Sequence, residues 1–316
     1  MKHITIISPN SFGYIDFLID ALDSKPDVVV TFINFENFKF RYNSKFEKVK
    51  NGFNKLFLNK NIKTVYRSKC ILESFHNIKK QNFIIVIRPD KIEKKTLLSL
   101  KDYTENLYAF YFDAISNFPK KIELIPIFDK VFSYEKDDVE KYNLKFITNY
   151  IYDIDQVSQE KIKHKIFNIS SFDNRFDDLR RIATYLKEQN INYKIIARKE
   201  GSNKTGLIDI TPDYMALPEV KKYIMDSEIL LDIQKQNQKG LSFRVFEALG
   251  YKKKLITTNS DIVNYDFYDS NNILVLDVNH IDIPKHFLNS TYKQIPETVL
   301  YKYTLEYWIE KVFYAE

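Results

Sequence analysis

Glu228-Ile-Leu-Leu-Asp-Ile-Gln234 is followed by Gly240-Leu-Ser-Phe-Arg-Val-Phe-Glu-Ala-Leu-Gly250 and then by Lys253-Lys-Leu-Ile-Thr-Thr-Asn259. The first and third runs are short and have apolar centres, Ile229–Leu231 and Leu255-Ile256, which predicts strands, and the middle run has the period of a helix. Gly240 allows close approach to the backbone just before a helix N-terminus, which is a ready site for an anion. Strand, loop, helix and strand in this order indicate a parallel α/β sheet.

The same alternation extends through most of the chain. Predicted strands are His3–Ser8, Val28–Ile33, Phe83–Ile87, Leu107–Phe112, Lys130–Ser133, Lys165–Ser170, Tyr193–Ala197, Glu228–Ile233, Lys254–Thr257 and Ile273–Leu276. Predicted helices include Ile15–Leu22, Arg175–Gln189, Leu217–Met225, Ser242–Leu249 and Thr304–Tyr314. The pattern lapses near residues 150–165, where we place a domain boundary. We therefore expect an α/β fold with two doubly wound Rossmann-like domains, 1–155 and 156–300, facing across a cleft, and a last helix, 301–316, packed back on the first domain.

Composition restricts the class of protein. The 316 residues are 44% hydrophobic and 28% charged, which is typical of a globular protein with a core. The single cysteine, Cys70, excludes an intrachain disulfide and a cysteine zinc site. The apolar run Ile4–Ile7 is too short for the core of a signal peptide, and no window approaches the roughly 20 apolar residues of a membrane helix. We expect a soluble, cytoplasmic protein.

Several chemistries lose their support because their motifs are missing. The chain has no Gly-x-Gly-x-x-Gly, no Gly-x-x-x-x-Gly-Lys-Ser/Thr and no Gly-x-Ser-x-Gly, and its five histidines lack zinc-ligand spacing. Asp153-Ile-Asp155 matches the Asp-x-Asp pattern of metal-dependent transferases, but it lies in the predicted linker and not after a strand. We therefore expect neither a metal nor another cofactor, and the missing glycine fingerprint makes a dehydrogenase or an epimerase a poor choice.

Residues 39–69 are strongly basic. They carry ten Lys or Arg against one acid, Glu47, with aromatic residues interleaved, among them Phe40, Tyr42, Phe46, Phe53 and Phe57. Such a segment can bind nucleic acid, a membrane surface or an anionic acceptor, or it can be the solvated face of a helical hairpin. No nucleic-acid module is present, so we expect no nucleic-acid partner, and peripheral contact with the inner membrane surface stays an alternative to the solvated face.

Arg244 and Glu247 are three residues apart and so lie on one face of the predicted helix. The guanidinium of an arginine can pair with a diphosphate, and a carboxylate can accept both hydroxyls of a ribose. From the spacing alone, an exposed ion pair on an ordinary helix is the favoured explanation of these residues.

The stretch around this pair resembles the nucleotide-sugar signature of GT-B glycosyltransferases, particularly the bacterial spore-maturation and lipopolysaccharide-capsule type. The matching residues are Gly240, Leu241, Phe243, Arg244, Phe246, Glu247, Ala248 and Leu249, with Ser242 inside the motif. Retaining members of the larger family carry two glutamates in this region, and only Glu247 has a counterpart here. The resemblance implies transfer of a sugar from a nucleotide-sugar donor to a glycan or lipid-linked glycan acceptor, and leaves an inverting or a retaining reaction open.

Two further stretches are similar to the same group. Residues 107–146 resemble the N-terminal domain of its polysaccharide-assembly members, and Ser170-Ser171-Phe-Asp173-Asn-Arg175 stands where the family holds phosphates. The resemblance assigns Ser171 and Arg175 to the donor, with Arg175 and Arg244 stabilising the leaving diphosphate. Arg198 and Lys199 end a predicted strand, where a cation can face a diphosphate, although a solvated strand end explains them as well.

The acceptor side is expected in the first domain. Ser11, Phe12 and Gly13 follow its first strand. If the enzyme inverts, it needs a general base, and the strand ends offer Asp113, Asp16 and Asp90. Lysines around Asp90 suggest a solvated carboxylate, so Asp113 is preferred and Asp16 is the reserve, although Asp113 can also cap a helix and Asp16 can simply favour a helix dipole. The rival hypothesis is a non-catalytic protein of this fold that binds a glycan or a partner.

Overall fold

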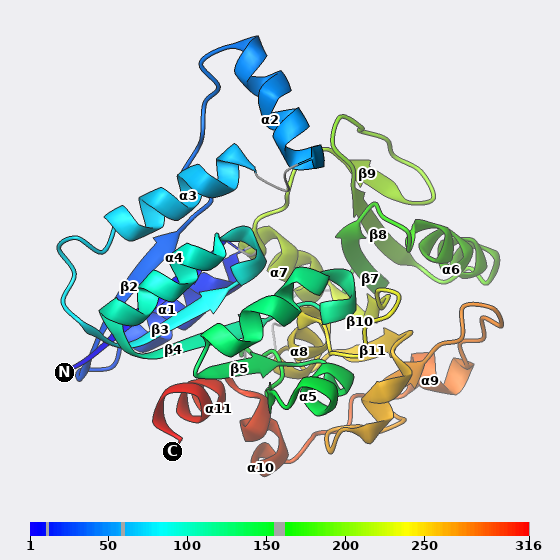
Figure 1. The fold of residues 1–316 in the computed structure, drawn as a ribbon. Coiled ribbons are helices and arrows are strands. Elements are labelled where there is room, and N and C mark those ends of the chain that lie inside the picture. The colour runs from blue at the N-terminus through cyan, green and yellow to red at the C-terminus, as the bar shows by residue number, and fades with distance from the viewer. Residues whose placement is uncertain (11–12, 58–60, 155–161, 316) are drawn as a thin grey trace. The chain divides into compact units, whose positions relative to one another are not determined.

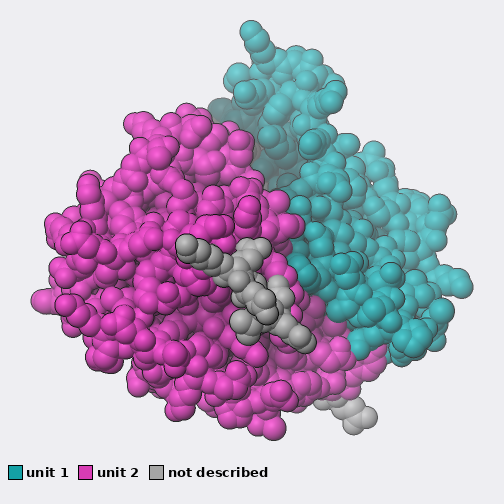
Figure 2. Space-filling view, turned by 180° about the vertical axis from the view of Figure 1, so that it is seen from behind, with its two compact units in different colours: residues 1–147 teal, residues 148–316 magenta. Residues whose placement is uncertain are grey.

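The computed structural model describes residues 1–10, 13–57, 61–154 and 162–315. The chain forms two compact units, residues 1–147 (unit 1) and 148–316 (unit 2), coloured separately in Figure 2. The predicted domain boundary at 155/156 lies outside the described residues. Among the helices of the described ranges, none combines the length and the apolar character that crossing a membrane requires.

Unit 1 is a six-stranded sheet with helices on its faces (Figure 1). Its elements are β1 (Lys2–Ser8), α1 (Tyr14–Asp23), β2 (Val28–Asn34), α2 (Lys45–Phe57), α3 (Ile62–Glu73), β3 (Gln81–Ile87), η2 (Pro89–Lys91), α4 (Lys94–Ser99), η3 (Leu100–Tyr103), β4 (Thr104–Tyr111), η4 (Ile115–Asn117), η5 (Pro119–Ile127), β5 (Lys130–Ser133), α5 (Lys136–Tyr142) and β6 (Lys145–Phe146). The strand order is β2-β1-β3-β4-β5-β6, and every pair is parallel. The order reverses direction between β1 and β3, so ligand chemistry in this unit is expected at the carboxyl ends of those strands.

Unit 2 is a second parallel sheet of six strands. Its elements are β7 (His164–Ser171), α6 (Phe176–Glu188), β8 (Tyr193–Arg198), β9 (Asp209–Thr211), α7 (Leu217–Met225), β10 (Ser227–Asp232), α8 (Phe243–Gly250), β11 (Lys254–Thr257), η6 (Ser260–Asn264), β12 (Ile273–Val275), α9 (Lys285–Asn289), α10 (Glu297–Leu300), η7 (Tyr301–Tyr303), α11 (Leu305–Ile309) and η8 (Glu310–Tyr314). The order β9-β8-β7-β10-β11-β12 is the Rossmann order counted from β7. Its switch point therefore lies between β7 and β10.

Alternation along the strands gives each sheet two buried faces. In β10, Leu230 belongs to the apolar cluster that contains α7 and α8, while its neighbours Ile229 and Leu231 belong to the cluster that contains α6 and α9. In unit 1 one cluster joins β3 and β4 to α3 and α4, and α1 buries Ile15, Leu18 and Leu22. Helices on both faces of a parallel sheet make each unit a doubly wound, Rossmann-like domain.

The predicted elements agree with the observed ones to within a few residues at their ends, which is the usual uncertainty of helix and strand limits. Two short edge strands, β6 and β9, were not predicted because two or three residues carry too little pattern. The last helix was predicted to begin at Thr304, but it begins one residue later, at Leu305. After Ile309 it continues as a π-type turn, η8. The expected packing of this helix on the first domain remains a prediction.

Candidate functional site

The carboxyl edge of unit 2 brings four of the predicted donor residues together. Ser171 at the end of β7 is the register partner of Arg198 at the end of β8, and Lys199 follows directly. The backbone N–H of Phe172 donates to the carbonyl of Arg198 over 2.9 Å, which ties the two strand ends to each other. Arg175 precedes α6 on the same edge. These hydroxyl and cationic groups therefore lie at one edge of the sheet, and their role in donor binding stays a prediction.

Arg175 clamps the two loops that border the switch point. Its guanidinium makes a two-pronged pair with Asp173, at 2.9 and 2.7 Å, and its Nη1 donates to the carbonyl of Ile233, just after β10, over 2.9 Å. Burial alone would raise the pKa of Asp173, but the hydrogen bonds and charge of Arg175 outweigh it and hold that pKa below its usual value. Sequence reasoning quoted Asp173 without assigning it this role.

Arg198 and Lys199 are arranged differently from Arg175. Arg198 lies over the ring of Tyr214 at 3.6 Å, and Lys199 over the ring of Phe172 at 4.0 Å. Within the part of the chain that the structure describes, neither cation is paired with a carboxylate, and the Nε of Arg198 is buried without a hydrogen-bond acceptor. Both positive charges thus remain available to an anion at this edge.

The loop between β10 and α8 is held in place by buried polar groups. Asp232, at the end of β10, accepts from the hydroxyl of Ser242 at 2.8 Å and from that of Thr257 at 3.0 Å. Ser242 is the residue before the first turn of α8, so Asp232 fixes this helix start against β10 and β11. The side-chain amide of Gln234 donates to the carbonyl of Gly240 over 3.0 Å.

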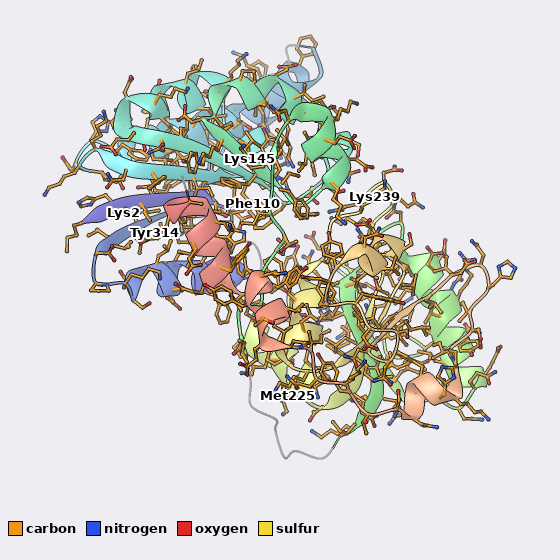
Figure 3. All side chains as sticks on the ribbon, turned by 90° about the horizontal axis from the view of Figure 1, so that it is seen from below. Lys2, Phe110, Lys145, Met225, Lys239 and Tyr314 are labelled. Carbon is orange, nitrogen blue, oxygen red and sulfur yellow. The ribbon has the colours of Figure 1, made fainter. Side chains whose placement is uncertain are left out.

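Neighbouring side chains complete the fixation of this loop. The amide of Asn149 donates to the carbonyl of Leu241 over 2.9 Å. The amide of Asn259 donates over 2.8 Å to the carbonyl of Lys239, a residue labelled in Figure 3. The amino end of α8 therefore has a fixed position at the carboxyl edge of the sheet.

Arg244 and Glu247 pair with each other in the interior, so the exposed ion pair considered from the sequence is not what forms. Their Nη1 and Oε2 atoms are 2.5 Å apart, and the Glu247 side chain is 0% exposed. The other carboxylate oxygen accepts from the hydroxyl of Tyr152 over 2.7 Å. Phe243 packs its ring against Tyr152 and Tyr150. Tyr152 lies far from the motif in sequence, and nothing in the residue pattern marks it as a partner of Glu247.

The Asp-x-Asp triplet is only partly described. Asp153 accepts from the hydroxyl of Tyr251 at 2.8 Å and pairs with Lys221 at 2.9 Å, while Asp155 lies outside the described residues. Among the residues that the structure describes, no three His, Cys, Asp or Glu side chains are grouped so as to hold a metal ion.

In unit 1 the candidate bases occupy two different environments. Asp113 follows β4 with a largely buried side chain, and its carboxylate is 3.8 Å from Nη1 of Arg88. Asp16 is exposed in the first turn of α1, where partial burial and then the charge of Asp20 raise its pKa. Gly13 precedes α1 with φ of 91°, a left-handed conformation that suits glycine. Ser11 and Phe12 lie outside the described residues.

The lysines around Asp90 led to the prediction that its carboxylate is solvated, and this prediction is wrong. Its side chain is 7% exposed, because Arg88 turns back and pairs with it through two hydrogen bonds of 2.9 and 2.8 Å. Burial opposes ionisation, but Arg88 outweighs it and lowers the pKa of Asp90. Arg88 adopts φ of 62° immediately before Pro89, and its guanidinium stacks on Phe118 at 4.3 Å. A non-glycine residue in this region is strained, which is typical of sites with a function.

Lys121 is a residue of unit 1 that sequence reasoning missed. Lysine side chains are almost never fully buried, yet that of Lys121 is. Its Nζ donates to the backbone carbonyl of Asp113 over 2.8 Å. Burial lowers the pKa of Lys121 to about 8, although Asp113 and Asp90 oppose the shift. The carboxyl ends of β3 and β4 therefore carry two acids and two cations in one cluster.

Comparison with solved structures identifies the fold. Sucrose-phosphate synthase from Thermosynechococcus elongatus superposes with a TM-score of 0.53 at 9% identity, over 88% of this chain and 87% of that one. UDP-GlcNAc 2-epimerase from Methanocaldococcus jannaschii matches with a TM-score of 0.52 at 12% identity over 100% of both chains. The same epimerase in complex with UDP-GlcNAc and UDP gives 0.51 at 14% identity, over 88% and 89%.

No protein-family model and no curated protein matches the sequence. At these identities the structural likeness establishes the fold alone. With two six-stranded parallel sheets, each doubly wound, it confirms the predicted α/β class: the chain has the GT-B fold, built from two Rossmann-like domains.

Proposed function

We infer that the chain is a nucleotide-sugar enzyme, and specifically a glycosyltransferase that moves a sugar to a hydroxyl of a cell-surface glycan such as a capsule or lipopolysaccharide. One observation carries the proposal. Arg198 and Lys199 present two positive charges, without carboxylate partners among the described residues, at the carboxyl edge of a Rossmann sheet beside its switch point. That is where a nucleotide diphosphate binds in doubly wound sheets.

The proposed chemistry follows from these positions. Arg198 and Lys199 stabilise the negative charge that develops on the leaving diphosphate, and the amides at the start of α8 add their partial positive charge. Arg175 is engaged by Asp173 and Ile233, so in this proposal it holds the two loops in place while its remaining N–H groups face the phosphates. No divalent ion is required, because protein cations supply the charge.

Glu247 is proposed to bind the donor ribose, as its motif suggests. Its carboxylate is fully engaged by Arg244 and Tyr152. Donor binding would therefore replace the hydroxyl of Tyr152 by ribose hydroxyls, which are chemically equivalent donors. Asp113 is proposed as the base for the acceptor hydroxyl, in line with its position at the end of β4 in unit 1.

The resemblance of residues 240–249 to the transferase signature favours transfer over the alternatives. A second candidate is epimerisation of the nucleotide sugar itself, and it is favoured by the likeness to an epimerase crystallised with UDP-GlcNAc and UDP. The fold does not choose between the two reactions. Incubation with the donor alone separates them, since an epimerase converts it without an acceptor and a transferase does not.

The proposal is tested by nucleotide binding. A thermal-shift series with UDP, GDP, CDP, CMP and dTDP identifies the base, and titration then gives the affinity. Replacing both cations, Arg198→Gln with Lys199→Gln, should weaken binding of that nucleotide by about a hundredfold or more, since each charge-assisted contact contributes roughly 1.5–3 kcal/mol and two contacts are lost. Glu247→Gln should weaken it by about tenfold on the same reasoning.

The matched control replaces Lys187 and Lys252 by glutamine. These exposed lysines lie at the ends of α6 and α8, away from the carboxyl edge of the sheet, so their loss should leave nucleotide affinity unchanged. If the Arg198/Lys199 variant folds normally and binds every nucleotide as the wild type does, the assigned donor site is wrong. If no nucleotide binds the wild type, the result favours the rival hypothesis of a non-catalytic protein that binds a glycan or a partner.

A further inference from the structure

Helix α2 presents an apolar face to solvent. The side chains of Phe46, Val49 and Phe53 are 76, 70 and 59% exposed. They stand at spacings of three and four residues, so they line one side of the helix. An amphipathic helix of a globular domain normally turns this face to the core. Figure 1 shows α2 beyond α3, away from the strands of its own unit.

The opposite side of α2 is polar and holds the helix in place. Among the side chains of α2 that the structure describes, residues 45–53, that of Asn51 is buried. It donates to the hydroxyl of Tyr42 over 2.8 Å and accepts from the backbone N–H of Ile62, at the start of α3, over 2.9 Å. Ring contacts of Phe40 with Tyr42 and Tyr66 support this anchor. The helix is therefore anchored through polar groups, with its apolar side facing outward.

Positive charge borders the apolar face on both sides. At about 100° per residue, Lys45 and Lys50 project roughly 70° to either side of the line through the exposed apolar residues. Both lysines are exposed. The one acid of the helix, Glu47, lies on the anchored side, where its carboxylate accepts from the backbone N–H of Asn43 over 2.6 Å. The outward side of α2 thus combines apolar and cationic groups.

We propose that α2 docks on the surface of a bilayer that contains anionic lipids. The apolar side chains enter the boundary between headgroups and acyl chains, and the flanking lysines contact the lipid phosphates, which is how interfacial amphipathic helices bind. A nucleic acid would satisfy the lysines but leave Phe46 and Val49 in water. The surface belongs to unit 1 and includes none of the residues to which the proposed reaction is assigned. It would place a lipid-linked acceptor close to the enzyme.

The experiment measures partition of the full chain into sedimented vesicles of phosphatidylcholine with phosphatidylglycerol, against phosphatidylcholine alone. We expect binding only to the anionic vesicles, and weaker binding as salt increases. Phe46→Ser with Val49→Ser should reduce the partition coefficient at least about a hundredfold, from the lost burial of two apolar side chains. Lys45→Gln with Lys50→Gln should reduce it by about thirtyfold.

Two matched variants of unit 1 serve as controls. Leu98→Ser with Ile122→Ser removes exposed apolar residues elsewhere, and Lys94→Gln with Lys95→Gln removes exposed lysines elsewhere. Neither should change binding by more than about twofold if α2 is the contact. The proposal is overturned if the wild type ignores anionic vesicles, or if the control variants lose as much binding as the α2 variants. It is also overturned if sedimentation in the absence of lipid shows a dimer that Phe46→Ser with Val49→Ser dissociates, because the apolar face then joins two copies.

Discussion

Replacing the buried Lys121 by methionine should change how the stability of unit 1 depends on pH. The side chain lies over the ring of Tyr111 at 4.7 Å and that of Phe118 at 5.1 Å, and its Nζ donates to the carbonyl of Asp113. Methionine fills a similar volume without the charge. Any constant cost of the lost hydrogen bond cancels when only the pH dependence of the difference is compared.

The magnitude follows from the pKa of the lysine. Burial lowers it from 10.5 to about 8 in the folded protein, whereas the unfolded chain keeps the ordinary value. Below pH 8 both states are protonated, and above pH 10.5 neither is. Between these values the unfolded state binds more protons, so the unfolding free energy rises with pH by about 1.4 kcal/mol per unit. Between pH 8 and pH 10.5 the unfolding free energy of the wild type should therefore rise by about 3 kcal/mol relative to that of Lys121→Met.

Urea unfolding by far-UV circular dichroism, repeated across this pH range, measures the difference. The one tryptophan, Trp308, belongs to unit 2, so its fluorescence identifies the unfolding transition of that unit. The remaining transition in the circular dichroism signal then belongs to unit 1. Lys120→Met, at the exposed neighbouring position, is the control and should show no pH-dependent difference. A flat difference between wild type and Lys121→Met, or one that falls with rising pH, would refute the reasoning.

Two other substitutions follow from the described contacts. Gly250→Ala would place a Cβ 2.5 Å from the carbonyl oxygen of Asp153, so it should destabilise unit 2 by about 1–3 kcal/mol, measured by urea unfolding with Trp308 fluorescence. Gly206→Ala meets nothing within 4 Å and should be neutral, and equal effects of the two would contradict the clash. Asp113→Asn should lower turnover by about a hundredfold or more with unchanged nucleotide affinity, whereas Asp16→Asn should not. Near-normal turnover of Asp113→Asn would remove it as the base.

The sequence was sufficient for the fold because the strands of parallel sheets leave a strong signal. Buried on both faces, they appear as continuous apolar runs, such as Leu107–Phe110 and Ile229–Leu231, separated by helical periods. The loops at the strand ends could also be predicted, since chain order alone places Ser171, Arg198 and Gly240 at carboxyl ends. The structure then adds that the first two are register partners.

Pairing between distant side chains could not be predicted. Glu247 and Tyr152 are 95 positions apart, and Arg175 reaches a carbonyl 58 positions away. Such contacts depend on how elements pack, which periodicity does not encode. Lys121 was missed for a related reason: lysine is almost never fully buried, so composition argued for solvent, and only the surrounding rings and carboxylates make its burial tolerable.

The two ends of unit 2 are joined to each other. The backbone N–H of Ile151 donates to the carbonyl of Tyr303, and the N–H of Leu305 donates to the carbonyl of Ile151. Nearby, the rings of Trp308 and Tyr150 make an edge-to-face contact. A domain whose beginning and end lie side by side can be inserted into, or removed from, a host chain without stretching either connection. If unit 2 binds the donor as proposed, it can be exchanged between proteins as one module when the chain is cut before residue 148, and such an exchange would give unit 1 a partner with a different nucleotide preference.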